Sequence, residues 1–178
     1  MMTIFLIGYM ASGKTTLGRA LSRATGMTFI DLDFYIQQRY RKTISEIFAE
    51  FGEERFREIE REMLHEVGEF CDVIVSCGGG TPCYFDNMDF MNQRGTTIWL
   101  QAGVECTVRR LLTAKTRRPI VEHILPAELP KFIQSHLEER RPHYSKARLS
   151  FPSEKIETRA EIAEQVDRLI TLLSLQPK

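Results

Sequence analysis

The stretch IGYMASGKTT, Ile7–Thr16, ends a short apolar run and decides the fold class of this chain. Its residues Gly8, Gly13, Lys14 and Thr15 match the pattern GxxxxGK[ST] in full, between a strand expected over 3–8 and a helix expected from Lys14 to about Ala24. Glycines let the backbone curl around phosphate oxygens, and the helix adds the positive end of its dipole. The spacing is not GxGxxG, so a dinucleotide fingerprint is excluded. The stretch predicts a loop that binds nucleotide phosphates rather than a Gly-rich turn with a solvated lysine.

This loop has defined chemical tasks. In such a loop the lysine, here Lys14, reaches the β- and γ-phosphates, and the hydroxyl of Thr15 ligates Mg²⁺. We therefore expect Mg²⁺ as the cofactor. The residues expected to contact the nucleotide here are Ala11, Ser12, Gly13, Lys14, Thr15 and Thr16.

Length and composition describe an ordinary globular protein. The chain has 178 residues, which suits a single domain over 1–178, and 43% of them are hydrophobic. Lys+Arg and Asp+Glu both number 24, so no overall field favours nucleic acid or an anionic membrane. The apolar runs are far shorter than the roughly 20 residues of a membrane span. We expect anion binding to arise from local placement of charge.

The N-terminus and the cysteines indicate a cytoplasmic protein. The first residues contain no basic region and no cleavage site, so no export signal is expected. The four cysteines, Cys71, Cys77, Cys83 and Cys106, form no CxxC pair and have no histidine at zinc-ligand spacing. Reduced thiols are therefore expected, rather than disulfides or a zinc site.

Short β-branched runs alternate with longer amphipathic segments along the chain. Strands are expected over 3–8, 27–31, 72–77, 96–101 and 147–152, and helices over 14–24, 43–70, 104–112, 128–142 and 159–173. Thr43 and Glu46 have the spacing of a capping box. The basic segment 113–126 has prolines toward both ends and is expected to be an exposed excursion. The alternation predicts a three-layer α/β fold whose parallel sheet is covered on both faces, with the site beyond the carboxyl ends of the strands.

Downstream residues narrow the class of nucleotide enzyme. A guanine-reading NKxD motif is absent, because neither Asn87 nor Asn92 is followed by lysine, which argues against a GTPase. The DLD segment is expected to end the second strand with Asp31 and Asp33 on one face. Two carboxylates beside a magnesium nucleotide suit two tasks: one serves the metal through water and the other accepts or orients a hydroxyl proton. The alternative is a turn at the strand end or a helix N-cap.

Six segments in this order resemble the shikimate kinase family over nearly the whole chain. They are GYMASGKTT, DLD, FREIE, CGGG, RRP and ERRPHY. The resemblance implies a P-loop kinase fold with a five-stranded parallel sheet, a helical substrate-binding segment at about 33–62 and a mobile lid at about 113–126. It implies transfer of the ATP γ-phosphate to the 3-hydroxyl of shikimate in aromatic amino acid biosynthesis. We expect a monomer whose partners are the small molecules shikimate and ATP, with no nucleic acid and no membrane.

The resemblance also implies roles for individual residues. Asp33 resembles the aspartate that holds the acceptor hydroxyl and acts as base, and Asp31 resembles the aspartate that serves Mg²⁺ through water. The first and second arginines on the substrate carboxylate are represented by Arg57 and Arg140. Gly79 is similar to the glycine whose backbone contacts the substrate. The lid arginine over the phosphates is represented by Arg118, and the positions flanking adenine are represented by Arg110 and Pro152.

Several assignments have alternatives. Arg57 could form only a surface i,i+4 pair with Glu53, and the glycines of CGGG could form only a tight turn. Arg141 competes with Arg140 for the substrate, and Arg117 competes with Arg118 for the lid. A one-residue insertion in 110–118 would affect the adenine side. Ala11 stands where many family members have glycine, which alanine tolerates if its φ is negative.

Two other functions compete with the first. A kinase of the same fold could act on another hydroxylated acid such as gluconate, and it would need a different acceptor pocket from Arg57 and Arg140. A catalytically silent ATP-binding module is the alternative from a different class. The presence of both Asp31 and Asp33 argues against that module.

Overall fold

The computed structural model describes residues 2–114, 121 and 123–176. Within them one parallel sheet has the strand order β2-β3-β1-β4-β5. Its strands are β1 (Thr3–Ile7), β2 (Thr28–Asp31), β3 (Val73–Ser76), β4 (Thr96–Gln101) and β5 (Leu149–Pro152). The registers of β1 with β3 and β4, and of the outer pairs, are all parallel. The expected α/β fold with five parallel strands is confirmed.

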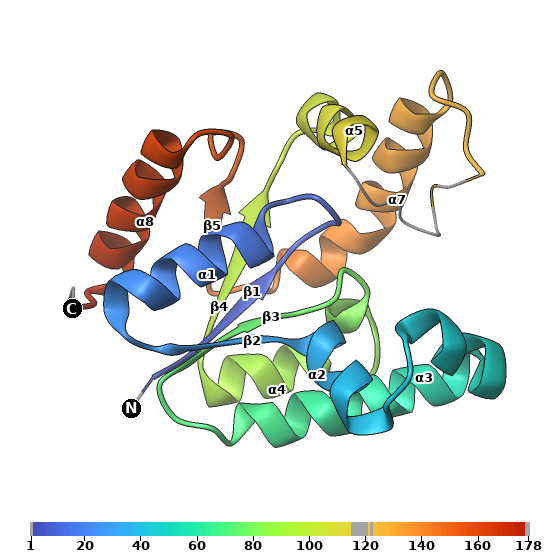
Figure 1. Ribbon diagram of the computed structural model, residues 1–178, viewed down its shortest axis with the longest axis horizontal. Coiled ribbons are helices and arrows are strands. Elements are labelled where there is room, and N and C mark those ends of the chain that lie inside the picture. The colour runs from blue at the N-terminus through green and yellow to red at the C-terminus, as the bar shows by residue number, and fades with distance from the viewer. Residues whose placement is uncertain (1, 115–120, 122, 177–178) are drawn as a thin grey trace.

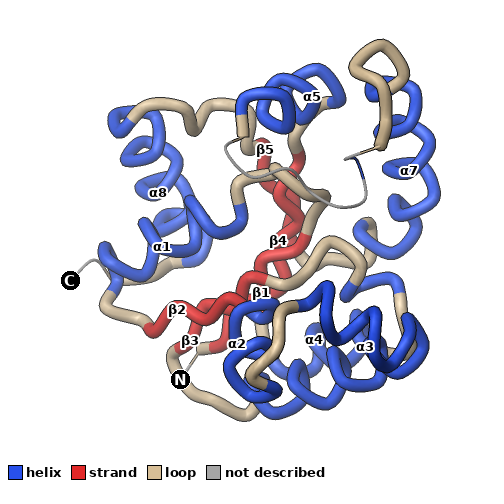
Figure 2. The backbone as a smooth tube through the Cα atoms, turned by 45° about the vertical axis from the view of Figure 1, so that its right-hand side comes forward, coloured by secondary structure: helices blue, strands red, loops and turns tan. Residues whose placement is uncertain are grey.

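Helices cover both faces of this sheet (Figure 1, Figure 2). They are α1 (Lys14–Thr25), α2 (Leu32–Tyr40), α3 (Ile44–Gly68), α4 (Asn87–Arg94), α5 (Val104–Thr113), α7 (Leu129–Tyr144) and α8 (Arg159–Leu173), with a 3-10 turn η1 (Thr81–Cys83). Among the described helices, none has the length and hydrophobicity that a bilayer span needs.

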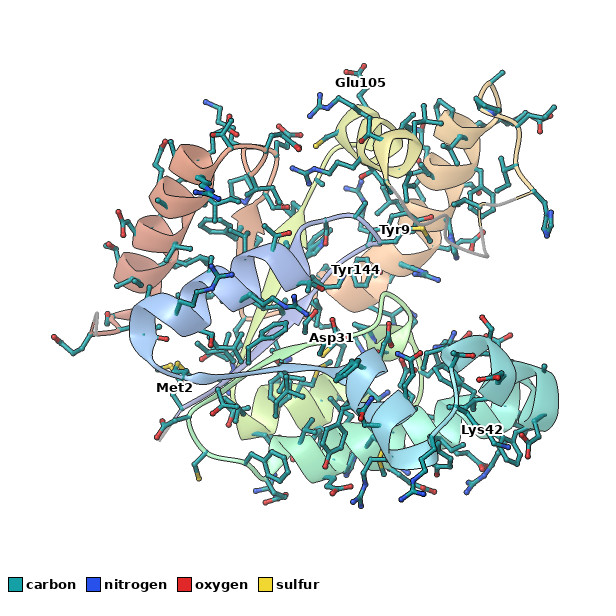
Figure 3. All side chains as sticks on the ribbon, in the orientation of Figure 1. Met2, Tyr9, Asp31, Lys42, Glu105 and Tyr144 are labelled. Atoms are coloured by element: carbon teal, nitrogen blue, oxygen red, sulfur yellow. The ribbon has the colours of Figure 1, made fainter. Side chains whose placement is uncertain are left out.

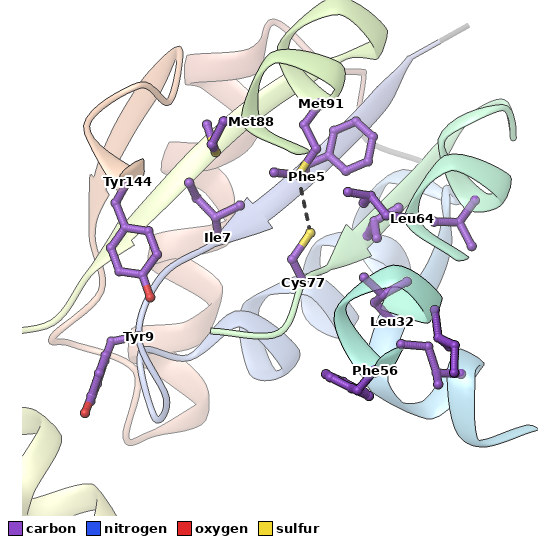
Figure 4. Close-up of a cluster of buried hydrophobic side chains, with 14 of the residues drawn as sticks. Phe5, Ile7, Tyr9, Leu32, Phe56, Leu64, Cys77, Met88, Met91 and Tyr144 are labelled. Atoms are coloured by element: carbon purple, nitrogen blue, oxygen red, sulfur yellow. Dashed lines mark hydrogen bonds between the residues drawn. The ribbon is translucent and has the colours of Figure 1, made fainter. Parts of the chain in front are cut away.

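The central strand β1 connects two hydrophobic cores because its side chains alternate between the faces. Ile4 and Leu6 pack with residues of α1 and α8, whereas Phe5 and Ile7 pack on the opposite face with residues of α2, α3, α4 and α7. Figure 4 shows part of the second core. All residues of β1 are buried. The loop that follows β1 is thereby anchored in the centre of the molecule.

Local signals set most helix ends where the sequence predicts them. Gly26 has φ 79° and ends α1. Thr43 and Glu46 form both hydrogen bonds of a capping box at the start of α3. Thr158 and Glu161 form a second capping box at the start of α8.

Three boundaries differ from the sequence expectation. Helix α7 continues through Pro142 to Tyr144, because a proline in the last turn removes only one N–H, and the Ser145 N–H still bonds the Arg141 carbonyl at 2.9 Å. Helix α3 breaks at Gly52, whose φ of 76° and ψ of 172° are not helical. Helix α4 was not predicted. Half of the proposed lid at 113–126, residues 115–120 and 122, lies outside the described residues.

Candidate active site

A cavity of about 560 Å³ lies at the carboxyl ends of β1, β2 and β3. Its walls come from the loop after β1, the β2–α2 junction, the glycines after β3, and the side chain of Arg110. Figure 3 labels Asp31, which lines this cavity. Strand β1 lies between β3 and β4; the chain runs from β1 toward β2 on one side of the sheet, and from β3 across to β4 on the other. Ligands of open α/β sheets bind at such a point.

The loop after β1 requires glycine at two places. A methyl group on Gly8, whose φ is 143°, would lie 2.6 Å from the carbonyl oxygen of Leu100. A methyl group on Gly13, whose φ is 94°, would lie 2.2 Å from Ile156 Cδ1. Lys14 Nζ crosses the loop and donates to the carbonyls of Gly8 and Tyr9, at 2.8 Å each. The backbone therefore curls around the lysine as the motif predicts.

Ala11 does not meet the condition under which alanine is tolerated at this position, which is a negative φ. Its φ is 58°, which is in the left-handed region. The Cβ of an L-residue costs roughly 1–2 kcal/mol there. The loop therefore has local strain at Ala11.

Asp31 serves two neighbours at the end of β2. Its Oδ2 accepts a hydrogen bond from Thr15 Oγ1 at 3.2 Å, and its Oδ1 caps α2 by accepting from the Phe34 N–H at 3.2 Å. The N-cap alternative is thus correct for Asp31, and it coexists with contact to the phosphate loop. A hydroxyl and a carboxylate side by side are oxygen ligands that suit Mg²⁺.

The sequence suggested that Asp33 and Asp31 lie on one extended segment, and the structure differs. Strand β2 ends at Asp31 and α2 begins at Leu32, so Asp33 stands in the first turn of a helix. Both aspartates nevertheless line the cavity. The helix turn, rather than the two-residue repeat of a strand, brings them together.

The glycines after β3 each face a different charged side chain. A methyl group on Gly78 would lie 3.0 Å from Asp33 Oδ1, and one on Gly79 would lie 3.0 Å from Arg140 Nη1. A methyl group on Gly80 would lie 2.8 Å from Arg57 Nη1. Glu60 Oε1 is also 3.0 Å from the methyl position on Gly78, so the loop brings two carboxylates and two guanidinium groups together, and larger residues would displace them.

Arg57 is both surface-paired and enclosed. Its Nη2 donates to Glu53 Oε1 at 3.2 Å, which is the expected i,i+4 pair, and its Nη1 donates to Glu60 Oε2 at 2.9 Å. Only 13% of the Arg57 side chain is exposed. The ring of Tyr84 lies 4.1 Å from Arg57 Cζ. The side chain is held in one orientation on several sides.

Glu60 is a site residue that sequence reasoning missed. It is 1% exposed, and burial raises the pKa of its carboxyl, while the charge of Arg57 opposes this rise. Its place three residues after Arg57, within FREIE, was the available signal, because side chains three apart share a helix face.

Arg140, rather than Arg141, reaches the glycine loop. Its guanidinium lies over the ring of Tyr9 at 5.5 Å and beside Gly79, whereas Arg141 is exposed. Tyr9 Oη is 3.0 Å from His136 Nδ1, one helical turn before Arg140. Burial raises the pKa of Tyr9 to about 12 and lowers the pKa of His136. Tyr9 therefore provides a neutral aromatic surface beneath the arginine.

Arg110 ties together the other end of the cavity. It donates to the carbonyls of Ala11 at 3.1 Å, and of Ser153 and Glu154 at 2.9 Å each, and to the carboxylate of Glu157 at 2.8 Å. Pro152, the last residue of β5, adjoins this point. Arg117 and Arg118 lie outside the described residues.

Comparison with known proteins gives a single consistent result. A family model described as shikimate kinase matches residues 10–171. A shikimate kinase from Parabacteroides distasonis is 50% identical over 173 residues, covering 97% of this chain and 100% of that protein.

Solved structures agree with this result. A 1.7 Å crystal structure of a shikimate kinase from Bacteroides thetaiotaomicron has a TM-score of 0.95 at 49% identity, over 98% of this chain and 99% of the other. A shikimate kinase from Acinetobacter baumannii, in complex with shikimate, has a TM-score of 0.83 at 29% identity, over 98% and 94%.

Proposed function

The chain belongs to the shikimate kinase family, and we propose how the residues around its phosphate-binding loop perform the ATP-dependent phosphorylation of shikimate. The reaction transfers the γ-phosphate of ATP to the 3-hydroxyl of shikimate and leaves ADP. Phosphoryl transfer asks a protein mainly for alignment of the two oxygens and for cations around the transferring group.

The phosphate side of the site is formed by residues 11–16. Lys14 donates hydrogen bonds to two loop carbonyls. In the presence of ATP, the β- and γ-phosphates would replace these carbonyls as its acceptors. Thr15 and Asp31 would hold Mg²⁺, directly and through water. The metal would neutralise charge on the phosphates when bound. Arg110 and Pro152 would flank adenine.

The acceptor side is formed by Asp33, Arg57, Gly79 and Arg140. Two guanidinium forks suit a carboxylate, because each can donate two parallel hydrogen bonds. Asp33 would accept the proton of the acceptor hydroxyl. At the same time the hydroxyl oxygen would bond to the γ-phosphorus, and the bond from that phosphorus to the β–γ bridging oxygen would break. Arg118 of the proposed lid would add positive charge over the phosphates, and closure would exclude water as a competing acceptor.

One observation supports these roles most strongly. Gly79 lies between the two sides: a methyl group on it would be 3.0 Å from Arg140 Nη1 and 3.6 Å from the backbone nitrogen of Met10 in the phosphate loop. Substrate held by Arg140 would therefore border the nucleotide phosphates, which in-line transfer requires.

A coupled assay of ADP release tests the substrate. Shikimate, quinate, gluconate and nucleoside monophosphates are compared with Mg-ATP present. We expect turnover with shikimate far above the others. Turnover with gluconate but not shikimate would overturn the substrate assignment, and no shikimate-dependent turnover would favour a silent ATP-binding module.

The remaining features of the proposal concern the protein in the cell. We propose a monomer of one domain over 1–178, with a substrate-binding segment at about 33–62. We also propose a cytoplasmic location, which suits the four cysteines, since thiols stay reduced in that compartment. Size-exclusion chromatography with light scattering would test the oligomeric state.

A further inference from the structure

Tyr144 joins two segments of the proposed acceptor pocket. It is fully buried near the end of α7, and its Oη donates a hydrogen bond of 2.6 Å to the carbonyl of Gly79, which is 65 residues away in the chain. Figure 4 shows the ring extending from its helix toward Tyr9.

Gly79 also lies beside Arg140, because a methyl group on it would be 3.0 Å from Arg140 Nη1. Arg140 and Tyr144 are four residues apart on α7, so their side chains share one face of the helix. Burial raises the pKa of Tyr144, and the positive charge of Arg140 opposes this rise. Gly79 therefore lies where the Tyr144 hydroxyl and the Arg140 guanidinium converge.

This junction matters because little else fixes Gly79. It has no side chain to pack, and it precedes η1 rather than belonging to a strand or helix. A buried tyrosine hydroxyl needs a partner, and a carbonyl beside it loses one if the hydroxyl is removed. The ring itself contributes separately to packing, for it lies 5.8 Å from the ring of Trp99.

We propose that Tyr144 is a positioning residue for shikimate, whose hydroxyl holds the Gly79 backbone and the Arg140 guanidinium in the relative placement that the substrate requires. This proposal rests on the function assigned to Gly79 and Arg140 above. It predicts that the hydroxyl acts on substrate affinity, whereas the ring acts on stability.

The test is Tyr144→Phe, which removes the hydroxyl and keeps the ring. Isothermal titration is expected to show shikimate Kd raised about tenfold, equivalent to about 1.4 kcal/mol. Steady-state kinetics are expected to show kcat and the KM for ATP within about twofold of wild type, as when binding common to ground and transition states is lost. The control is Ser22→Ala, which removes a hydroxyl that donates to the Met27 carbonyl at 2.7 Å and should leave shikimate Kd unchanged.

A second measurement separates positioning from general damage. Tyr144→Phe is also made in an Arg140→Lys background, where we expect its effect on shikimate Kd to shrink to about threefold or less, because coupled residues are not additive. If the single variant is partly unfolded, the titration is repeated with Mg-ADP, which stabilises the native state by binding to it.

Three results would overturn the proposal. They are an unchanged shikimate Kd in Tyr144→Phe, an equal rise in the KM of ATP and shikimate, and an equal tenfold loss in both arginine backgrounds. Each leaves the kinase assignment intact if wild-type enzyme phosphorylates shikimate. Failure of wild-type turnover would instead contradict the proposed function.

Discussion

The carboxylate of Glu60 lies 2.9 Å from Arg57 Nη1 and is almost completely buried. Its second oxygen accepts a 2.5 Å hydrogen bond from Thr81 Oγ1 in the turn after the glycine loop. Glu60 thus links the arginine on α3 to the loop that contacts it at Gly80. Burying a pair of charged groups away from water is costly in free energy. The role of Glu60 is therefore better explained as holding Arg57 in position than as stabilising the fold.

Arg57→Ala is expected to raise the shikimate KM by roughly 10–100-fold, because a charge-assisted hydrogen bond to a carboxylate contributes about 1.5–3 kcal/mol. The KM for ATP should change little. The control is Arg55→Ala, which removes an exposed arginine of the same helix that pairs with Glu58 and Glu62. Equal KM values for shikimate in the two variants would return Arg57 to a surface ion pair with Glu53.

Glu60→Gln is expected to change the pH dependence of stability. The folded pKa of Glu60 is raised above its unfolded value of about 4.3, so its favourable contribution is present below that value and is lost as pH rises through the folded pKa. The variant should therefore gain stability relative to wild type as pH rises from 4 toward neutrality, at the cost of a higher shikimate KM. Urea unfolding across this pH range measures the difference. A difference that is constant with pH would refute the expectation.

Asp33→Asn is expected to lower kcat by roughly 10²–10⁴-fold, which is the usual contribution of a positioned general base. ATP affinity should stay within a few-fold, because the phosphate loop is untouched. Steady-state kinetics with both substrates check this, and Asp89→Asn, at an exposed position of α4, is the matched control. Near-normal turnover would remove Asp33 from the role of base.

Lys14→Ala is expected to abolish turnover while the fold persists. The lysine donates to the carbonyls of Gly8 and Tyr9 and to the Ser12 hydroxyl, and the loss of such bonds should lower stability by about 1–2 kcal/mol. Circular dichroism and thermal unfolding measure the fold, with Lys131→Ala as an exposed control. Loss of the native spectrum would show that the lysine is mainly structural.

The sequence was sufficient for features that depend on local patterns. The phosphate loop, the strand 96–101 and the helix 159–173 follow from periodicity and from motif spacing, and the structure confirms their bounds. The Thr43–Glu46 capping box is equally local. Such features need no knowledge of what lies opposite in space.

Features that depend on three-dimensional neighbours were missed or misplaced. Asp33 was assigned to an extended segment because a two-residue repeat cannot show that the helix starts at Leu32. The contact of Tyr144 with the glycine loop was not predicted, because its hydrogen bond joins residues that are 65 apart in the chain. The helix was expected to end at Pro142 because proline disfavours a helix interior. Helix propensity alone does not show that this proline lies in the last turn, where the missing N–H is tolerated. Arg57 and Glu60 required the sheet topology to bring them to the glycine loop.

The break at Gly52 has a further consequence for dynamics. It divides α3 into a short helical segment, 44–51, and a long helical segment, 53–68. The ring of Phe48 in the short segment lies 5.8 Å from Cζ of Arg57 in the long segment. The non-helical backbone at Gly52 interrupts the cooperative series of helical hydrogen bonds. The amides before and after this glycine should therefore exchange with deuterium at two different rates. The segment 44–51 should take up deuterium first, and its uptake should slow when shikimate is bound. Equal uptake rates in the two segments would show that the break at Gly52 does not separate their dynamics.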